Sequence, residues 1–455
     1  MQIVALFIIA ITIFLIVKRY QTHATLFISG FALLATAHLA RIFSGDSGIE
    51  ESITGLFAFD LFAMVSEAFS TRVARIGMII MAAGGFAKYM SAISASRALV
   101  NLSIKPLSRI SSPYVLLAIT YIAGQILNIF IPSAAGLAML LLVAMYPTLV
   151  KLGVRPVAAA AVIGTTACLD LGPASPAANV AAETIGISAI EYFVRYQMKI
   201  SAMVIPVVAV AHFFWQRWCD GREANPADSL SEDLPDTVED QNDPPLFYAL
   251  LPILPLVLLF IFSPLVVDTI RLDVVTSMLI SLAVGMACEG VRHGSLREAL
   301  AGIVHFFSGM GKIFSSVVTL IVAAEIFATG IKATGLIGSL VSVVEGNAMG
   351  GGVMAVMLVL LLGATALLTG SGNAALFSFA GMIPGIAMRV NASLESLMLP
   401  SQLAGGLFRS FSPVAGVIIA VAGTAGVTPF EIVKRTSVPM IAGVFATLAA
   451  SQLLL

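Results

Sequence analysis

A long apolar run of this chain is interrupted by glycines and short polar side chains. The interruption consists of Thr369, Gly370, Ser371, Gly372 and Asn373. Lipid cannot satisfy polar groups, so irregular backbone at membrane depth must lie against protein or line a water-filled cavity. We interpret the stretch as the tip of a re-entrant hairpin spanning about residues 353–388. The alternative is a glycine kink inside an ordinary spanning helix, since membrane helices tolerate glycine.

A second interruption lies upstream, at Asn128–Gly136, and suggests a hairpin over about residues 113–150, with two short full spans as the alternative. Landmarks in the two regions keep an almost constant separation of 237 to 240 positions. The paired landmarks are Ser133 with Ser371, Pro147 with Pro384, Ser175 with Ser412, and Gly186 with Gly426. Such an offset indicates an internal repeat. Repeats that each hold a broken segment indicate the binding site of a transporter.

The composition sets the class of the protein. Hydrophobic residues make up 59% of the 455 residues and charged residues 11%, whereas soluble domains carry about 25% charged residues. The chain is therefore predicted to be an all-α polytopic membrane protein. With a net charge of -1 and no basic stripe, we expect no nucleic-acid partner. The three cysteines lack metal-ligand spacing, and no cofactor is expected.

The two repeats are predicted to run in opposite senses. The first covers residues 1–215, with spans at 2–17, 25–42, 76–100, a broken helix at 156–186, and 192–214. The second covers residues 246–455, with spans at 246–267, 274–291, 303–331, a broken helix at 393–424, and 430–455. Five spans is an odd number, so the second repeat must be inverted. Residues 53–69 fit an interfacial amphipathic helix or, alternatively, a short span.

Charge at the ends of the spans predicts the orientation. Lys18 follows the first span, and basic residues mark the cytoplasmic side. Both termini should then be periplasmic, and the acidic linker at residues 216–245 cytoplasmic. A solvated linker is the simplest interpretation of its composition.

Charges at membrane depth are costly and are candidates for function. Arg409 lies near the centre of the second broken helix, and Asp170 lies at the corresponding point of the first. Arg409 could hold a carboxylate through two hydrogen bonds, with Asp170 coupling a proton or cation. The alternative is a purely structural Arg409–Asp170 pair. Glu325 is a second coupling candidate. Lys312 of the same predicted helix could neutralise it or could instead extend its charged end to the membrane surface.

No catalytic motif appears, so the chain is not expected to be an enzyme. An intramembrane enzyme and an ion channel remain weaker alternatives to a secondary transporter. The paired broken elements favour alternating access over an open pore.

Several motifs resemble the anaerobic C4-dicarboxylate carriers of the DcuC type, in the ion transporter superfamily. They are Ser112–Leu116, Ala211–Arg217, Thr369–Asn373, Arg409–Pro413 and Pro429–Pro439. The resemblance extends over essentially the whole chain. It implies an elevator-type fold, usually a homodimer, in the bacterial inner membrane. It also implies succinate, fumarate or malate as substrate, moved by antiport or by cation-coupled transport. A citrate-like anion or a monocarboxylate is the alternative substrate.

Hairpin tips and breaks together form the predicted site. The candidate substrate-binding residues are Ser133, Ala134, Gly136, Ser175, Thr369, Gly370, Ser371, Gly372, Asn373, Arg409, Ser412 and Pro413. The coupling ion is expected to be a proton or sodium, with sodium near Ser133, Ser371 and Asn373.

Overall fold

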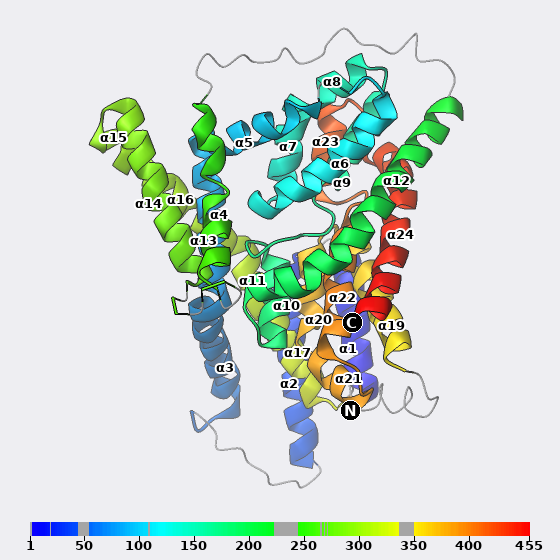
Figure 1. Ribbon diagram of the computed structural model, residues 1–455. Helices are drawn as coiled ribbons and strands as arrows, with labels where there is room; N and C mark the ends of the chain where they lie inside the picture. The colour runs from blue at the N-terminus through cyan, green and yellow to red at the C-terminus, as the bar shows by residue number, and fades with distance from the viewer. Residues whose placement is uncertain are drawn as a thin grey trace.

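The computed structural model describes residues 2–18, 20–43, 54–107, 110–222, 244–263, 266–267, 269–270, 272–335 and 350–455. Within these ranges the chain is helical and contains no strand. Most of the predicted linker at residues 216–245 lies outside the described residues, as do residues 44–53. Figure 1 shows long helices surrounding shorter, broken ones.

The helices of the first half follow the apolar runs. They are α1 (Gln2–Val17), α2 (Thr22–Phe43), α3 (Phe57–Arg72), η1 (Val73–Gly77), α4 (Met78–Ala92), α5 (Ala95–Ile104), α6 (Pro113–Phe130), α7 (Ala134–Ala144), α8 (Tyr146–Lys151), α9 (Pro156–Thr165), α10 (Pro176–Ile185), α11 (Ala189–Tyr192), η3 (Phe193–Gln197) and α12 (Met198–Arg222).

The second half begins after the linker. Its helices are η5 (Leu246–Leu250), α13 (Leu254–Ile261), α14 (Val274–His293), α15 (Leu296–Ala301), α16 (Ile303–Ile313), η6 (Phe314–Val318), α17 (Thr319–Ala333), α19 (Gly351–Thr369), α20 (Gly372–Ala380), α21 (Ile383–Arg389), α22 (Leu394–Arg409), α23 (Gly416–Thr424) and α24 (Pro429–Leu454).

The protein is an all-helical, multi-pass membrane protein. By length and composition, seven helices among the described residues could each cross a bilayer, or eight if a bent pair counts as one span. The sequence had suggested ten spans. Two of the seven, α6 and α19, belong to the predicted hairpins, so five of the ten predicted spans are continuous helices of this length. The predicted broken helices fall short because α9 and α10 have ten residues each and α23 has nine. About 20 residues are needed to cross the hydrocarbon core.

Three predicted segments differ from the structure. The span at 76–100 is two helices, α4 and α5, bent by 75° where Ser94 adopts a left-handed conformation with φ 61°. The segment at 53–69 is not a separate helix, because α3 continues through the π-helical turn η1 into α4. Residues 246–267 hold no long helix: a 3₁₀ turn leads to α13, which has only eight residues. Pro252 and Pro255 interrupt the hydrogen bonding there.

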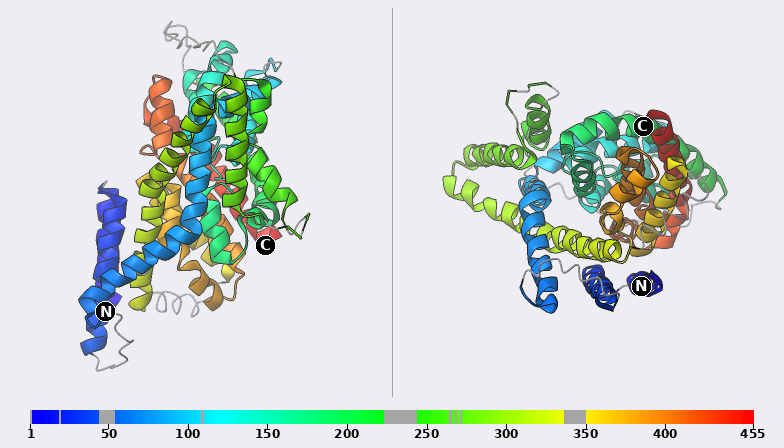
Figure 2. Two further views of the ribbon diagram at one scale, coloured as in Figure 1. Left: turned by 90° about the vertical axis from the view of Figure 1, so that its left-hand side faces the viewer. Right: turned by 90° about the horizontal axis from the view of Figure 1, so that it is seen from below.

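The helices fall into two groups, here called the body and the arm. The body includes α6, α9, α10, α12, α19, α22, α23 and α24; within it α12 packs along α24, α19 along α22, and α6 against α9. The arm includes α2, α4, α16 and α17; within it α2 packs along α17 and α4 along α16. Figure 2, seen from below, shows α14 to α16 projecting to one side of the body. The two breaks, between α9 and α10 and between α22 and α23, lie inside the body (Figure 1).

A buried ion pair fixes α12 against α24. The Arg435 side chain is 2% exposed, and its Nη1 lies 2.6 Å from Oδ1 of Asp220. Tyr114 of α6 donates a hydrogen bond of 2.9 Å to the other carboxylate oxygen. Burying a charge without a partner is expensive, so this network specifies how three helices of the body meet.

Candidate functional site

The joint between α9 and α10 is an irregular, buried segment. After α9 ends at Thr165, Asp170 takes a φ of +47° and Gly172 a φ of +96°. Such angles suit glycine and, less often, aspartate. Ser175 then caps α10 by accepting a hydrogen bond from the Ala178 amide at 3.4 Å, and Pro176 occupies the first helical position.

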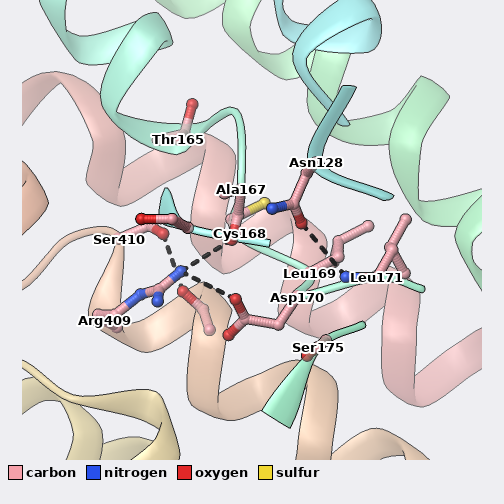
Figure 3. A network of polar contacts seen from close by, with 12 residues as sticks. Asn128, Thr165, Ala167, Cys168, Leu169, Asp170, Leu171, Ser175, Arg409 and Ser410 are labelled. Carbon is pink, nitrogen blue, oxygen red and sulfur yellow. Dashed lines mark hydrogen bonds and ion pairs between the residues drawn. The ribbon is translucent and has the colours of Figure 1, made fainter. Parts of the chain in front are cut away.

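Amide side chains from other helices satisfy the exposed backbone of this joint. Asn128, from the first hairpin, accepts a hydrogen bond of 3.3 Å from the Leu171 amide (Figure 3). Gln197 accepts one of 3.0 Å from the Gly172 amide. Gln402 of α22 donates to the Leu169 carbonyl at 3.1 Å. These bonds replace the helical ones that the break removes, as an environment without water requires.

Gln197 and Gln402 also bond to each other, at 2.9 Å, and so connect the two halves of the chain. Sequence reasoning did not select either residue. The available signal was an uncharged amide inside an apolar helix, which in a membrane has to find a partner. Asn128 carries the same signal, and it lies at the start of the first interruption but outside the predicted set of site residues.

The second hairpin tip packs directly on the second break. Gly370 has a φ of +70°, and a Cβ added there would lie 2.7 Å from the Val414 carbonyl oxygen. Ser412 donates a hydrogen bond of 2.5 Å to the Leu367 carbonyl, which binds the break to the hairpin. Pro413 is half-buried beside it. Glycine is needed at position 370 because any side chain would separate these two backbones, and a Cβ at position 372 would lie 2.6 Å from the backbone of Gly405 in α22.

All but one of the polar side chains of this tip form hydrogen bonds with neighbouring residues of the chain. Ser371 caps α20 by accepting from the Ala374 amide at 3.1 Å. Thr369 donates to the Thr365 carbonyl at 2.8 Å and accepts from the Ser371 amide at 3.2 Å. Oδ1 of Asn373, however, is buried and has no hydrogen-bond partner within the described part of the chain. A buried acceptor of this kind calls for a ligand, water or ion.

Arg409 and Asp170 meet where the two breaks come together. Nη2 of Arg409 lies 3.5 Å from Oδ1 of Asp170 and donates a hydrogen bond of 2.8 Å to the Ala167 carbonyl (Figure 3). Both side chains are largely buried, 14% and 15% exposed. The backbone of Gly406 lies against the same segment, since an added Cβ would be 2.3 Å from the Cys168 carbonyl oxygen.

This ion pair leaves bonding capacity unused. Charge-assisted N–H···O bonds measure about 2.7–2.9 Å, so a separation of 3.5 Å is long. Nη2 makes both contacts, while Nε of Arg409 is buried and has no hydrogen-bond partner in the described residues. Because its Nε has no partner and its contact with Asp170 is long, the guanidinium can bind a carboxylate without first breaking a strong ion pair.

The first hairpin tip makes a different environment. Ser133 caps α7 by accepting from the Gly136 amide at 3.2 Å, and both residues are exposed. Ala134 is half-buried. None of the contacts recorded for these three residues reaches Arg409. The structure therefore brings together the residues predicted at the second tip and at both breaks. Within the described part of the chain, Ser133, Ala134 and Gly136 make no hydrogen bond or ion pair with those residues.

Glu325 is paired with Arg72, a residue that sequence reasoning missed. Two nitrogens of Arg72 donate to the Glu325 carboxylate at 2.6 and 2.8 Å, and its Nη1 donates to Glu183 at 3.0 Å. The expectation that Lys312 neutralises Glu325 is therefore wrong. Lys312 precedes Glu325 by 13 positions on a helix interrupted by η6, so the two side chains cannot be neighbours on one face.

A family model for the C4-dicarboxylate anaerobic carrier, DcuC, matches residues 1–454. The chain belongs to this family. It is 34% identical over 445 residues to the anaerobic C4-dicarboxylate transporter DcuC of Escherichia coli K12, covering 96% of this chain and 93% of that protein. It is 32% identical over 444 residues to a probable anaerobic C4-dicarboxylate transporter DcuC of Vibrio cholerae, covering 97% and 95%.

The fold is shared with a solved structure of a more distant protein. MtrF of Neisseria gonorrhoeae, assigned to a class of antimetabolite efflux pumps, superposes with a TM-score of 0.62 over 96% of each chain. The two sequences are 14% identical, so this comparison concerns the fold alone. The family resemblance found from the sequence motifs is confirmed.

Proposed function

We propose that this protein is a secondary active transporter of C4-dicarboxylates such as succinate, fumarate and malate. The observation that carries the proposal is Arg409, buried between the two breaks with its Nε unbonded in the described residues. A dicarboxylate brings two negative charges, and burying them requires a compensating cation. Membership of the C4-dicarboxylate carrier family supports the same substrate class.

In the bound state, one substrate carboxylate lies against the Arg409 guanidinium, and Asp170 gives up its long contact. The neutral donors of the second tip, the Ser371 hydroxyl and the backbone amides near it, receive the other end of the substrate. Ser412 and Pro413 hold the break that presents Arg409. Substrate binding thus exchanges a weak internal pair for a bidentate one.

Coupling is assigned to Asp170 and to an ion. When a substrate carboxylate displaces Asp170 from Arg409, that aspartate is left buried without its cation, and protonation relieves the cost. Sodium is the alternative ion. The unpartnered Oδ1 of Asn373 is an acceptor, which fits a cation better than it fits a carboxylate. Glu325, already held by Arg72, is the weaker coupling candidate.

Transport by this scheme requires alternating access. The two repeats, inverted relative to each other, carry the two tips to opposite faces of the site, and the body moves against the arm as in an elevator. We place the protein in the bacterial inner membrane as a homodimer associated through the arm, with both termini periplasmic. Chemical crosslinking in membranes tests the dimer, and a protein that stays monomeric at every concentration contradicts it.

The experiment that tests the function is uptake into proteoliposomes. Radiolabelled succinate, fumarate and malate are compared with citrate and lactate, each with and without sodium and pH gradients. We expect the three C4 acids to be transported, and preloaded unlabelled succinate to accelerate uptake if the protein is an antiporter. Transport of citrate or lactate without any C4 acid would show that the substrate class is wrong.

A further inference from the structure

A cavity lies directly beside the second hairpin tip. Its volume is about 330 Å³. One wall is the turn between α1 and α2, with Tyr20, Gln21, Thr22 and His23. The other wall includes Thr369 of the tip and Val414 of the second break. The cavity therefore connects the edge of the site to a surface formed by a different part of the chain.

The polar groups of this cavity suit an anion. None of its described lining residues is acidic, and the α1–α2 turn offers a phenol, an amide, a hydroxyl and an imidazole. The phenol, the amide and the hydroxyl can donate hydrogen bonds to a carboxylate, and so can Nδ1 of the imidazole when it carries a proton. Nε2 of His23 lies 3.3 Å from the Ser316 carbonyl, which holds the turn against η6 while the cavity stays open beside it.

A much smaller cavity occupies the equivalent place beside the first hairpin tip. Its volume is about 20 Å³, the space of roughly one water molecule. Pro132 of the first tip and Pro173 of the first break line it, together with Leu256 and Leu259 of α13. All thirteen of its lining residues are apolar.

The two cavities occupy corresponding positions in the repeat. Pro132 and Thr369, from the two tips, are 237 positions apart, and Ile16 and Leu256, on the facing walls, are 240 apart. These separations equal the offset of the internal repeat. One entrance of the pair is thus open and polar, and the other is closed by apolar packing.

We propose that the cavity between the α1–α2 turn and the second tip is the open entrance to the dicarboxylate site, where Gln21 and His23 bind the substrate carboxylate in transit. This inference rests on the proposed transport function. The entrance beside the first tip is the closed one in this state. Lys18 adjoins the open entrance in sequence, and basic residues mark the cytoplasmic side, so this entrance faces the cytoplasm.

Cysteine labelling tests the entrance. Gln21→Cys and His23→Cys are made in the full-length chain with Cys288 replaced by serine; Cys168 and Cys219 are buried and are kept. A membrane-impermeant maleimide is applied to inside-out and right-side-out vesicles, with and without succinate. We expect labelling in inside-out vesicles that succinate slows. Lys151→Cys, exposed and remote from the cavity, is the control that should be labelled at the same rate with or without succinate.

A second pair of variants examines the closed entrance. Leu256→Cys and Leu259→Cys should resist the reagent in right-side-out vesicles, where their entrance would face the reagent, as well as in the inside-out vesicles in which His23→Cys reacts. In transport assays, Gln21→Ala and His23→Ala should raise the KM for succinate by about 2- to 10-fold, the value of one lost hydrogen bond, with little change in kcat.

The outcomes separate this inference from the function on which it rests. If no C4-dicarboxylate is transported at all, the proposed function fails. If succinate is transported normally but neither slows labelling at Gln21→Cys and His23→Cys nor shows a raised KM in the alanine variants, the cavity is not the entrance. Equal reactivity of Leu256→Cys and His23→Cys would also overturn the assignment of one open and one closed entrance.

Discussion

At the scale of single residues, Arg409 determines what the site can bind. Arg409→Lys keeps the charge but loses the planar fork, so we expect succinate transport to fall substantially. Arg409→Ala should abolish it. Removing one member of a buried pair costs about 3–5 kcal/mol, so the alanine variant could also lose stability by leaving Asp170 unpaired. Uptake and succinate binding are measured on protein that remains monodisperse.

The double variant Arg409→Ala, Asp170→Asn separates these two effects. It removes both charges, so a purely structural role predicts that folding and transport recover together. We expect folding to recover while succinate binding stays absent. If the double variant binds succinate with the affinity of the unmodified protein, the pair is structural and the anion site lies elsewhere.

At the scale of elements, the site depends on close contact between backbones. A Cβ at position 372 would lie 2.6 Å from the backbone of Gly405, and one at position 406 would lie 2.3 Å from the Cys168 carbonyl oxygen. Gly372→Ala and Gly406→Ala should therefore push the tip and the breaks apart. Overpacking of this kind costs about 1–3 kcal/mol, so we expect a lower Tm in detergent and weaker transport.

Gly416→Ala is the matched control for those variants. Gly416 begins α23, and nothing lies within 4 Å of an added Cβ. Alanine favours a helix over glycine, so the Tm should be unchanged or slightly higher and transport should persist. If Gly372→Ala and Gly406→Ala behave like Gly416→Ala, the tip and the breaks are not held by backbone contact.

At the scale of the whole molecule, Arg72 joins three helices from distant parts of the chain. It bonds Glu183 of α10, which begins at the first break, and Glu325 of α17 in the arm. We expect Arg72→Gln to lower the Tm more than Glu183→Gln does, because it leaves two carboxylates facing each other. The rate of succinate transport should change in both variants, while the Kd for succinate stays within about twofold. The reason is that none of Arg72, Glu183 and Glu325 contacts Arg409.

Arg195→Gln provides the comparison, because its pair with Glu191 joins residues of one helical segment and is 58% exposed at the arginine. Exposed pairs contribute about 0–1 kcal/mol, so Tm and turnover should barely change. A Tm for Arg72→Gln equal to that of Arg195→Gln would mean that the ion pairs of Arg72 with Glu183 and Glu325 do not hold the body to the arm.

The sequence alone determined the class of the protein and the positions of the breaks that follow α9 and α22. Apolar runs are long enough to cross a bilayer, and Gly172, Pro173, Gly370 and Pro413 disrupt helical geometry whatever surrounds them. These are local properties, which explains why these two breaks, with Arg409 and Asp170 beside them, could be predicted from residue types and spacing. The family was recognised from the resemblance of longer motifs, and the bend at Ser94 was not predicted.

The tertiary structure decided which polar groups meet. Arg72 and Glu325 are 253 positions apart, and Gln197 and Gln402 are 205 apart. No local pattern specifies such pairs, because many packings of apolar helices have similar hydrophobic energies in lipid. Among them, the arrangement is selected by the need to satisfy each buried charge, amide and broken backbone group. That requirement places Arg409 beside Asp170, and it pairs Glu325 with Arg72 instead of with Lys312.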